Sequence, residues 1–327
     1  MRRSHRDNAP VLVLQPLPGI GDMVWHLPAL RALAASRGKL IIMTKKRSLA
    51  DQLLLGNHDI DRVIWLERGP GRHDGLPGLF RLVADLRRLH VNEAWVMHGS
   101  ARYTLALYLA GVPKIIAPGK GLQKLFADPA LWLRADQLRT HPTVRAENML
   151  KRAGIPQPQH EGSLQADADY LAQVKQDYPQ TDRLVAFAIG SSEPFRQWGA
   201  ANFTELARRL LQQGLEVVLV GGSAEQAMAD EIRAQITEPG LHVEINRPLP
   251  YITALLVSAK ACIGNDTGVL NIALASGTTT FGLFGGTPPL SHAASLRVIQ
   301  AVDTRQAMAG ISVQQVYETV APVLGIE

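Results

Sequence analysis

Short apolar runs alternate with amphipathic helical patterns along the whole chain, and this alternation is typical of a parallel α/β sheet. In the first half, the pattern predicts strands near residues 11–15, 40–44, 62–65 and 93–97, and helices at 23–35, 76–90, 101–110 and 144–153. In the second half, it predicts strands at 184–189, 216–220, 262–264 and 279–284, and helices at 202–212, 224–235, 251–259 and 268–275. The sequence shows no internal repeat of the length that builds solenoids.

The length of the chain favours two hydrophobic cores rather than one, because 327 residues exceed the usual size of a single core. A stretch rich in Pro, Gln and other polar residues, GIPQPQHEGSLQADADY, separates the two sets of elements and is typical of a linker. We therefore expect an N-terminal domain over 1–155, a linker over 156–182 and a C-terminal domain over 183–327. Residues 113–139 show no regular pattern.

Charge is divided unevenly between the halves. Residues 1–154 contain 24 Lys and Arg against 12 Asp and Glu, whereas residues 155–327 contain 10 against 17. A basic first domain suggests an anionic partner, such as a phosphorylated lipid or a membrane surface, although a solvated basic face without a partner gives the same count. Nucleic acid is the weaker partner, since no motif of a nucleic-acid-binding fold accompanies the charge.

Hydropathy along the chain predicts a cytoplasmic protein. No apolar run approaches the roughly 20 residues of a membrane-spanning helix, and the run at 11–14 behind the basic N-terminus is too short for a signal-peptide core. The single cysteine, Cys262, excludes an intrachain disulfide, and its apolar strand predicts an inert core residue.

The segment CIGNDTGVLNIALASGTTTFGLFGGTPP predicts a phosphate-binding turn. A buried strand runs directly into Asn265, Asp266, Thr267 and Gly268, and a small-residue helix follows. Free N–H groups and the positive end of the helix dipole would then lie at the carboxyl edge of a parallel sheet, where such sheets hold phosphates. The alternative is that Asp266 and Thr267 only cap the helix.

The N-terminal segment VLVLQPLPGIGDMVWH has the same order of strand, loop and helix. Gly19 and Gly21 allow a tight turn, so that Asp22 begins the helix near the same kind of sheet edge. A dinucleotide-binding loop would look similar, but Val24 occupies the third glycine position and the second strand ends in Thr-Lys-Lys without an acidic residue. A nicotinamide-dependent enzyme therefore stays only a distant alternative.

Two further loops of the second half end strands and open helices. In AIGSSEPFRQW, Ser191 and Ser192 can donate hydroxyl and backbone N–H groups to a diphosphate, and Arg196 can neutralise negative charge. The adjacent Trp198 is expected to pack in the core. In LVGGSAEQ, the glycines allow close approach of a nucleotide, and Glu225 either accepts hydrogen bonds from ribose hydroxyls or is a first-turn residue favoured by the helix dipole.

Five motifs together resemble those of family 9 glycosyltransferases, the bacterial heptosyltransferases of lipopolysaccharide core assembly. They are, in family order, GIGDMVWHLPALRAL, HPTVRAENMLKRAGI, FAIGSSEPFRQWGAANFTELARRL, VVLVGGSAEQ and GNDTGVLNIALASGTTTFGLFGGT. The resemblance implies an α/β protein with two Rossmann-like domains facing a central cleft, the glycosyltransferase-B fold. It also implies inverting, metal-independent transfer, with heptose from ADP-heptose as the donor sugar and a lipopolysaccharide core as the acceptor, and no cofactor.

The resemblance also implies roles for single residues. Asp22 occupies the position of the proposed general base, which takes a proton from the acceptor hydroxyl, although it would serve equally as a helix cap. Arg196 stands where the family commonly has Lys and would stabilise the leaving diphosphate. Ser191, Ser192, Glu225 and the turn 266–268 would bind the donor, and residues 113–139 would form a loop over an anionic glycolipid acceptor, with possible contact to the inner membrane.

Three positions depart from the family pattern. Asn271 stands where His is usual, Gln15 replaces a basic residue, and Pro288 replaces an expected Asp. Asn271 still donates a neutral hydrogen bond to a phosphate or sugar but carries no charge. These departures leave two alternatives open, a transferase of the same family with another nucleotide sugar or a non-lipid acceptor, and a nucleotide-sugar-binding protein without turnover.

Overall fold

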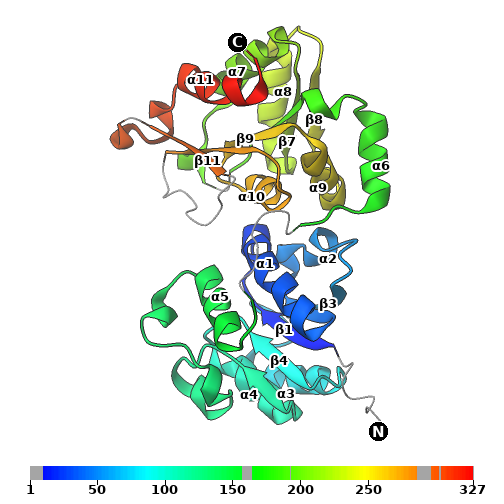
Figure 1. Cartoon of the computed structure of the whole chain (residues 1–327), viewed down its shortest axis with the longest axis vertical. Coiled ribbons are helices and arrows are strands. Elements are labelled where there is room, and N and C mark those ends of the chain that lie inside the picture. Colours follow the sequence, from blue (N-terminus) through cyan, green and yellow to red (C-terminus); the bar gives the residue numbers. More distant parts are fainter. Residues whose placement is uncertain (1–9, 157–163, 192, 286–295, 302, 327) are drawn as a thin grey trace. The chain divides into compact units, whose positions relative to one another are not determined.

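The computed structural model describes residues 10–156, 164–191, 193–285, 296–301 and 303–326, and they form two compact units (Figure 1). The first unit spans Met1–Gln159 and the second His160–Glu327. Within the described residues, no helix is both long enough and apolar enough to cross a membrane. Cys262 is fully buried, and burial raises the pKa of its thiol to about 12, as expected for an inert core residue.

The first unit is a five-stranded parallel sheet with helices packed against it (Figure 1). Its strands have the spatial order β3-β2-β1-β4-β5, and the inner strands β1 and β2 form because their apolar runs are buried on both faces. The strands are β1 (Val11–Gln15), β2 (Leu40–Thr44), β3 (Ile60–Trp65), β4 (Glu93–Val96) and β5 (Lys114–Ile116). The helices are α1 (Ile20–Arg37), α2 (Ala50–Leu53), α3 (Gly75–Arg87), α4 (Ala101–Ala110) and α5 (Pro142–Arg152).

Short 3-10 turns fill the rest of the first unit. They are η1 (Lys46–Ser48), η2 (Gly121–Leu125), η3 (Pro129–Leu131) and η4 (Gln137–Arg139). Residues 113–139, which show no regular pattern in the sequence, thus contain one short strand and three such turns. Gln123 fixes this segment to the sheet, because its buried side chain donates to the carbonyl oxygens of His98 at 2.8 Å and Ser100 at 3.3 Å.

The second unit is a six-stranded parallel sheet in the order β11-β10-β9-β6-β7-β8. The strands are β6 (Leu184–Ala188), β7 (Glu216–Gly221), β8 (Leu241–Ile245), β9 (Ala261–Asn265), β10 (Thr280–Phe284) and β11 (Leu296–Gln300). The helices are α6 (Ala168–Asp177), α7 (Ala200–Gln212), α8 (Gln226–Gln235), α9 (Leu249–Ser258), α10 (Gly268–Ala275) and α11 (Val313–Leu324). The 3-10 turns are η5 (Thr181–Arg183), η6 (Pro194–Arg196), η7 (Ser223–Glu225) and η8 (Thr304–Gly310).

Helix α6 lies in the segment 156–182 that the sequence predicts to be a linker, and it packs in the second unit. Asp167 caps its first turn, and Val174 is fully buried. Two tyrosines anchor the following turn: the Tyr178 hydroxyl donates to Glu244 at 2.7 Å, and the Tyr251 hydroxyl donates to Asp177 at 2.8 Å. These contacts with β8 and α9 explain why a polar sequence forms an ordered helix here.

Candidate active site at two sheet edges

The second sheet reverses its strand order between β6 and β9, and ligands of open α/β sheets bind at such a point, beyond the carboxyl ends of the strands. Asn265, the last residue of β9, joins the two loops that start there. Its buried side chain donates to the carbonyl oxygens of Ile189 at 2.9 Å and Gly190 at 3.2 Å, and accepts from the Trp198 N–H at 3.2 Å. The loops after β6 and β9 are therefore held in one fixed arrangement.

Arg196 and Asp266 meet across this point. The guanidinium Nη1 of Arg196 lies 3.3 Å from the Asp266 carboxylate, and both side chains are only partly exposed. Nε of Arg196 is buried without a hydrogen-bond partner among the described residues, and the guanidinium stacks 5.4 Å from the ring of Phe195. Arg196 thus keeps donor capacity beyond its ion pair, whereas Trp198 packs in the core and donates from Nε1 to Ile311.

The turn after β9 opens helix α10 as the sequence predicts. Thr267 is the N-cap, and its hydroxyl accepts from the Leu270 N–H at 3.3 Å. Gly268 is the first helical residue, where backbone N–H groups have no partner inside the helix. Asn271 is buried, and its side-chain amide donates to the Thr267 carbonyl at 2.9 Å, so this contact stiffens the turn. Pro288 lies outside the described residues.

The remaining donor-side candidates lie on neighbouring loops. Ser191 is half-buried, and its hydroxyl donates to the Glu193 carbonyl at 3.0 Å. Ser192 lies outside the described residues. Glu225 ends η7 and accepts from the Gly222 N–H at 2.8 Å, which is a capping contact. A Cβ on Gly190 would lie 3.1 Å from the Glu225 carboxyl carbon, so this carboxylate reaches the loop after β6.

In the first unit, Asp22 lies in the first turn of α1, after the central strand β1. Its Oδ2 accepts from the Gly19 N–H at 2.9 Å, so the carboxylate contributes to capping, while the N-cap itself is Gly19. Gly19 is extended, and a Cβ there would lie 2.9 Å from the Asp22 carboxylate. Gly21 lies inside the helix. The close approach of the Asp22 carboxylate thus explains the glycine at position 19.

A buried polar network surrounds the backbone of Asp22. Thr44 donates to the Gln15 side-chain oxygen at 3.2 Å, and the Gln15 amide reaches the Asp22 carbonyl at 3.4 Å. Nδ1 of His26 lies 2.6 Å from the same carbonyl, so this nitrogen carries the proton and donates. Gln15 therefore positions the start of α1, because a fully buried neutral amide satisfies a carbonyl without the cost of burying a charge.

His26 gives the protein a predicted sensitivity to acid. Burial lowers its pKa from the usual value near 6.5, against opposing contributions from Asp22. Below pH 6.5, His26 binds a proton in the unfolded chain but not in the folded chain. The free energy of unfolding therefore falls as the pH falls, and for one proton this slope is at most about 1.4 kcal/mol per pH unit. We expect His26→Asn, which keeps an N–H donor, to reduce the drop in melting temperature between pH 7.5 and 5.5.

The exposed His58 provides the control for this measurement, because His58→Asn removes a histidine without disturbing a buried contact. His98 and His141 also have lowered pKa values and remain in both variants. An equal drop in melting temperature for the wild type and His26→Asn would contradict the assignment.

Basic side chains gather at the carboxyl edge of the first sheet, and we call this set the basic edge. Lys45 follows β2, Arg68 follows β3, Lys120 precedes η2, and Arg145 lies on α5. Burial and these four cations together lower the pKa of His98, which follows β4. The basic edge is therefore a concentration of positive charge around a histidine that stays neutral near pH 7.

The helix α5 brings this charge close to Asp22. Arg145 and Asp22 both act on the pKa of His141, which Arg145 and burial lower and Asp22 raises. The His141 ring also packs edge-on against Trp25, with ring centroids 5.0 Å apart. Sequence reasoning assigns no role to His141 or Arg145, although their spacing of four residues at a helix start places them on one face.

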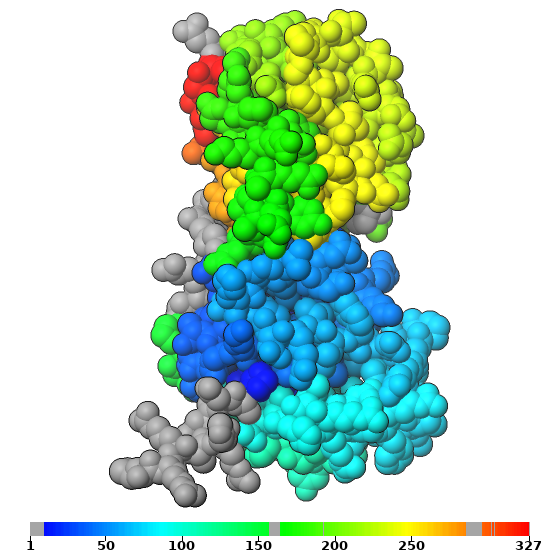
Figure 2. Space-filling model, turned by 90° about the vertical axis from the view of Figure 1, so that its right-hand side faces the viewer, coloured from blue at the N-terminus to red at the C-terminus, as the bar shows by residue number. Residues whose placement is uncertain are grey.

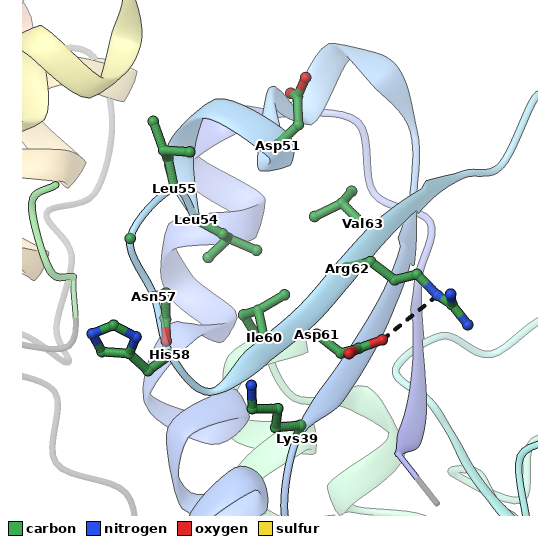
Figure 3. A pocket seen from close by; sticks show the side chains of 11 residues that line it. Lys39, Asp51, Leu54, Leu55, Asn57, His58, Ile60, Asp61, Arg62 and Val63 are labelled. Atoms are coloured by element: carbon green, nitrogen blue, oxygen red, sulfur yellow. Dashed lines mark ion pairs between the residues drawn. The ribbon is translucent and has the colours of Figure 1, made fainter.

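A separate hollow of about 360 Å³ lies at the opposite end of the first sheet (Figure 3). Lys39 and Ile60 line it at the amino ends of β2 and β3, and Leu55 lies at its rim beside α2. Figure 3 also shows the neighbouring ion pair, Asp61 to Arg62, at 3.6 Å. Because open α/β sheets bind ligands at carboxyl ends, this hollow is not part of the candidate site.

Comparison with known proteins gives consistent matches. Residues 129–320 match the family described as glycosyltransferase family 9 (heptosyltransferase). Lipopolysaccharide heptosyltransferase 2 of Salmonella typhimurium is 24% identical over 310 residues, which are 89% of this chain and 88% of that protein. These matches confirm the resemblance that the motifs indicate.

Solved structures agree on the fold. A glycosyltransferase family 9 protein from Veillonella parvula superimposes with a TM-score of 0.80 at 19% identity, over 99% of both chains. An E. coli heptosyltransferase with ADP-2-deoxy-2-fluoro heptose gives 0.73 at 18% identity, over 95% of this chain and 98% of that one. The predicted fold class, two Rossmann-like α/β domains of the glycosyltransferase-B type, is confirmed.

Proposed function

Because this chain belongs to glycosyltransferase family 9, we propose that it moves heptose from ADP-heptose to a lipopolysaccharide core or a related cell-envelope glycan. The observation that carries this proposal is the arrangement at the reversal point of the second sheet. There, Arg196 has a buried Nε with no hydrogen-bond partner among the described residues, beside the N-terminus of α10, and Asn265 holds both loops. A guanidinium with a spare donor and a helix N-terminus suit a diphosphate.

In the proposed reaction, Asp22 takes the proton of an acceptor hydroxyl as that oxygen bonds to the anomeric carbon of the donor. The bond from this carbon to the diphosphate oxygen breaks, and the electron pair leaves with the diphosphate. Attack opposite the leaving group inverts the anomeric centre. Arg196 and the N-terminus of α10 stabilise the charge that develops on the diphosphate, which gives this chain's own groups the role that a metal has in other transferases.

The donor-side candidates contribute binding rather than chemistry. Gly268 offers backbone N–H groups to phosphate oxygens, and Ser191 can add a hydroxyl from the loop after β6. Glu225 suits the ribose hydroxyls, because one oxygen caps Gly222 and the other remains to accept hydrogen bonds. Asn271 acts indirectly. Its side-chain amide donates to the Thr267 carbonyl and so stabilises the phosphate-binding turn.

The basic edge supports an anionic glycolipid acceptor. Lys45, Arg68, Lys120 and Arg145 would bind its negatively charged groups, while Asp22 approaches the reacting hydroxyl. We therefore assign acceptor binding to the first domain and donor binding to the second. A lipid-linked acceptor also places the enzyme at the cytoplasmic face of the inner membrane.

A thermal-shift measurement with ADP, UDP, GDP and NAD in turn tests the donor assignment. A ligand at 100 times its dissociation constant adds about 2.7 kcal/mol to the stability of the folded protein. We expect ADP alone to raise the melting temperature clearly. A selective response to UDP or GDP would indicate a donor with that nucleotide and still support a transferase. A response to NAD alone would overturn the proposal.

A further inference from the structure

Three neighbouring elements of the first unit expose large apolar side chains. Leu76 and Phe80 lie one helical turn apart on α3, and Leu122 and Leu125 lie on one side of η2. Together with Tyr108 on α4, these side chains are between 59% and 72% exposed. Single exposed apolar residues are ordinary, but a group on adjacent elements marks an interaction site. We call these five side chains, together with the cations on the same elements, the apolar–basic face; in Figure 2, α3 and α4 have the cyan colours of the bar and η2 the adjoining blue-green.

Contacts through α4 show that these three elements are neighbours. Arg102, at the start of α4, donates to the carbonyl oxygens of His73 and Gly75 in front of α3, and Arg87, at the end of α3, donates to the Leu109 carbonyl. Helices α3 and α4 therefore run alongside each other. On the other flank, Tyr108 packs against Phe126 with ring centroids 5.3 Å apart, which joins α4 to η2.

The charge of these elements is almost entirely positive. Helices α3 and α4 and the turn η2, with its preceding residue, carry five cations and one acid. The cations are Arg81, Arg87, Arg102, Lys120 and Lys124. The acid, Asp85, is already bound by Arg72 at 2.9 Å and by His73 at 3.1 Å. An apolar surface with a basic surround matches the two signals that hold proteins on anionic bilayers.

We propose that the apolar–basic face docks the protein on an anionic phospholipid bilayer. The apolar side chains enter the boundary between headgroups and acyl chains, and the cations contact lipid phosphates. A second copy of the chain fits less well, because a symmetric pair would bring the same five cations together. The proposal deepens the proposed function, from which it takes the lipid-linked acceptor.

The position of η2 relates docking to the basic edge. Gln123 of η2 donates to the carbonyl oxygens of His98 and Ser100, and the Lys120 side chain packs against Gly99. The apolar–basic face and the basic edge therefore share Lys120. A lipid-anchored acceptor that emerges beside η2 has a short route to the carboxyl edge of the first sheet.

Vesicle co-sedimentation tests the proposal directly. The full chain is mixed with phosphatidylglycerol–phosphatidylcholine vesicles, and we expect binding that weakens with salt and with pure phosphatidylcholine. Leu76→Ser combined with Phe80→Ser, two exposed positions on α3 outside residues 113–139, changes no charge and is expected to reduce partitioning by about tenfold or more. Leu55→Ser, which removes an exposed leucine at the hollow of Figure 3, is the matched control and is expected to bind normally.

The variants also separate this proposal from the proposed function. The double variant should keep the ADP thermal shift and transfer to an acyl-free, soluble acceptor, since it alters no candidate site residue. Equal partitioning of the double variant and the wild type onto vesicles would overturn the docking surface. So would a wild-type protein that binds no vesicles but self-associates in solution, if the double variant abolished that self-association. Vesicle binding without a thermal shift from ADP, UDP or GDP would instead support the docking surface and contradict the proposed function.

Discussion

Asp22→Asn is expected to lower the rate of sugar transfer by about 10²–10⁴-fold, the usual contribution of a general base. In the wild type, the Gly19 N–H donates to the Asp22 carboxylate at 2.9 Å. The side-chain oxygen of Asn can accept the same hydrogen bond, so the start of α1 should stay intact. It cannot take a proton from the acceptor hydroxyl. The measurement is single-turnover transfer at saturating donor, with the melting temperature and the ADP thermal shift recorded for the same preparation.

Asp22→Ala provides a second comparison, because it removes both the base and the capping contact. A further control is Asp167→Asn, which alters a carboxylate that caps α6 by accepting from the Asp169 N–H at 3.0 Å. We expect the control to transfer sugar at the wild-type rate. If Asp22→Asn transferred at that rate too, while Asp22→Ala were slow and unstable, the carboxylate would be a helix cap and the base would lie elsewhere.

The central elements could be predicted from the sequence because their apolar runs are continuous. Strands β1 and β2 and helices α4 and α10 have the bounds that the pattern predicts. The edge strand β8 was missed, since its residues are all half-buried and its sequence, LHVEI, includes two polar positions. Helix α6 was missed for a related reason: it depends on contacts of Tyr178 and Tyr251 that lie far apart in the chain.

The candidate site could be predicted only where its residues are close in sequence. The turn with Asp266, Thr267 and Gly268 follows directly from a buried strand and a small-residue helix, and the structure has it. The pairing of Asp266 with Arg196 joins positions 70 residues apart, so no local pattern indicates it. Likewise, the cations around His98 come from separate elements: Lys45 and Arg68 follow parallel strands that end at one edge, whereas Arg145 comes from α5.

Arg196→Ala is expected to lower the rate of transfer by about 10²–10³-fold, the range seen when one charged or hydrogen-bonding group is removed from a developing anion. The loss has two causes. The leaving diphosphate would lose a cation, and Asp266 would lose the guanidinium that lies 3.3 Å from its carboxylate. Arg196→Lys should recover part of the rate, because it keeps the charge but not the planar pair of donors.

The design separates leaving-group stabilisation from donor binding. If Arg196 acts mainly on the leaving group, Arg196→Ala should reduce kcat more than it weakens the ADP thermal shift, and the double variant with Asp266→Asn should lose less than the two single losses combined. Arg209→Ala is the matched control, since Arg209 is similarly exposed and pairs with Glu205 at 2.9 Å on α7. Full activity of Arg196→Ala would contradict a role of Arg196 in stabilising the leaving group. Equal losses of activity in Arg196→Ala and Arg209→Ala would show that the Arg196–Asp266 pair is only structural.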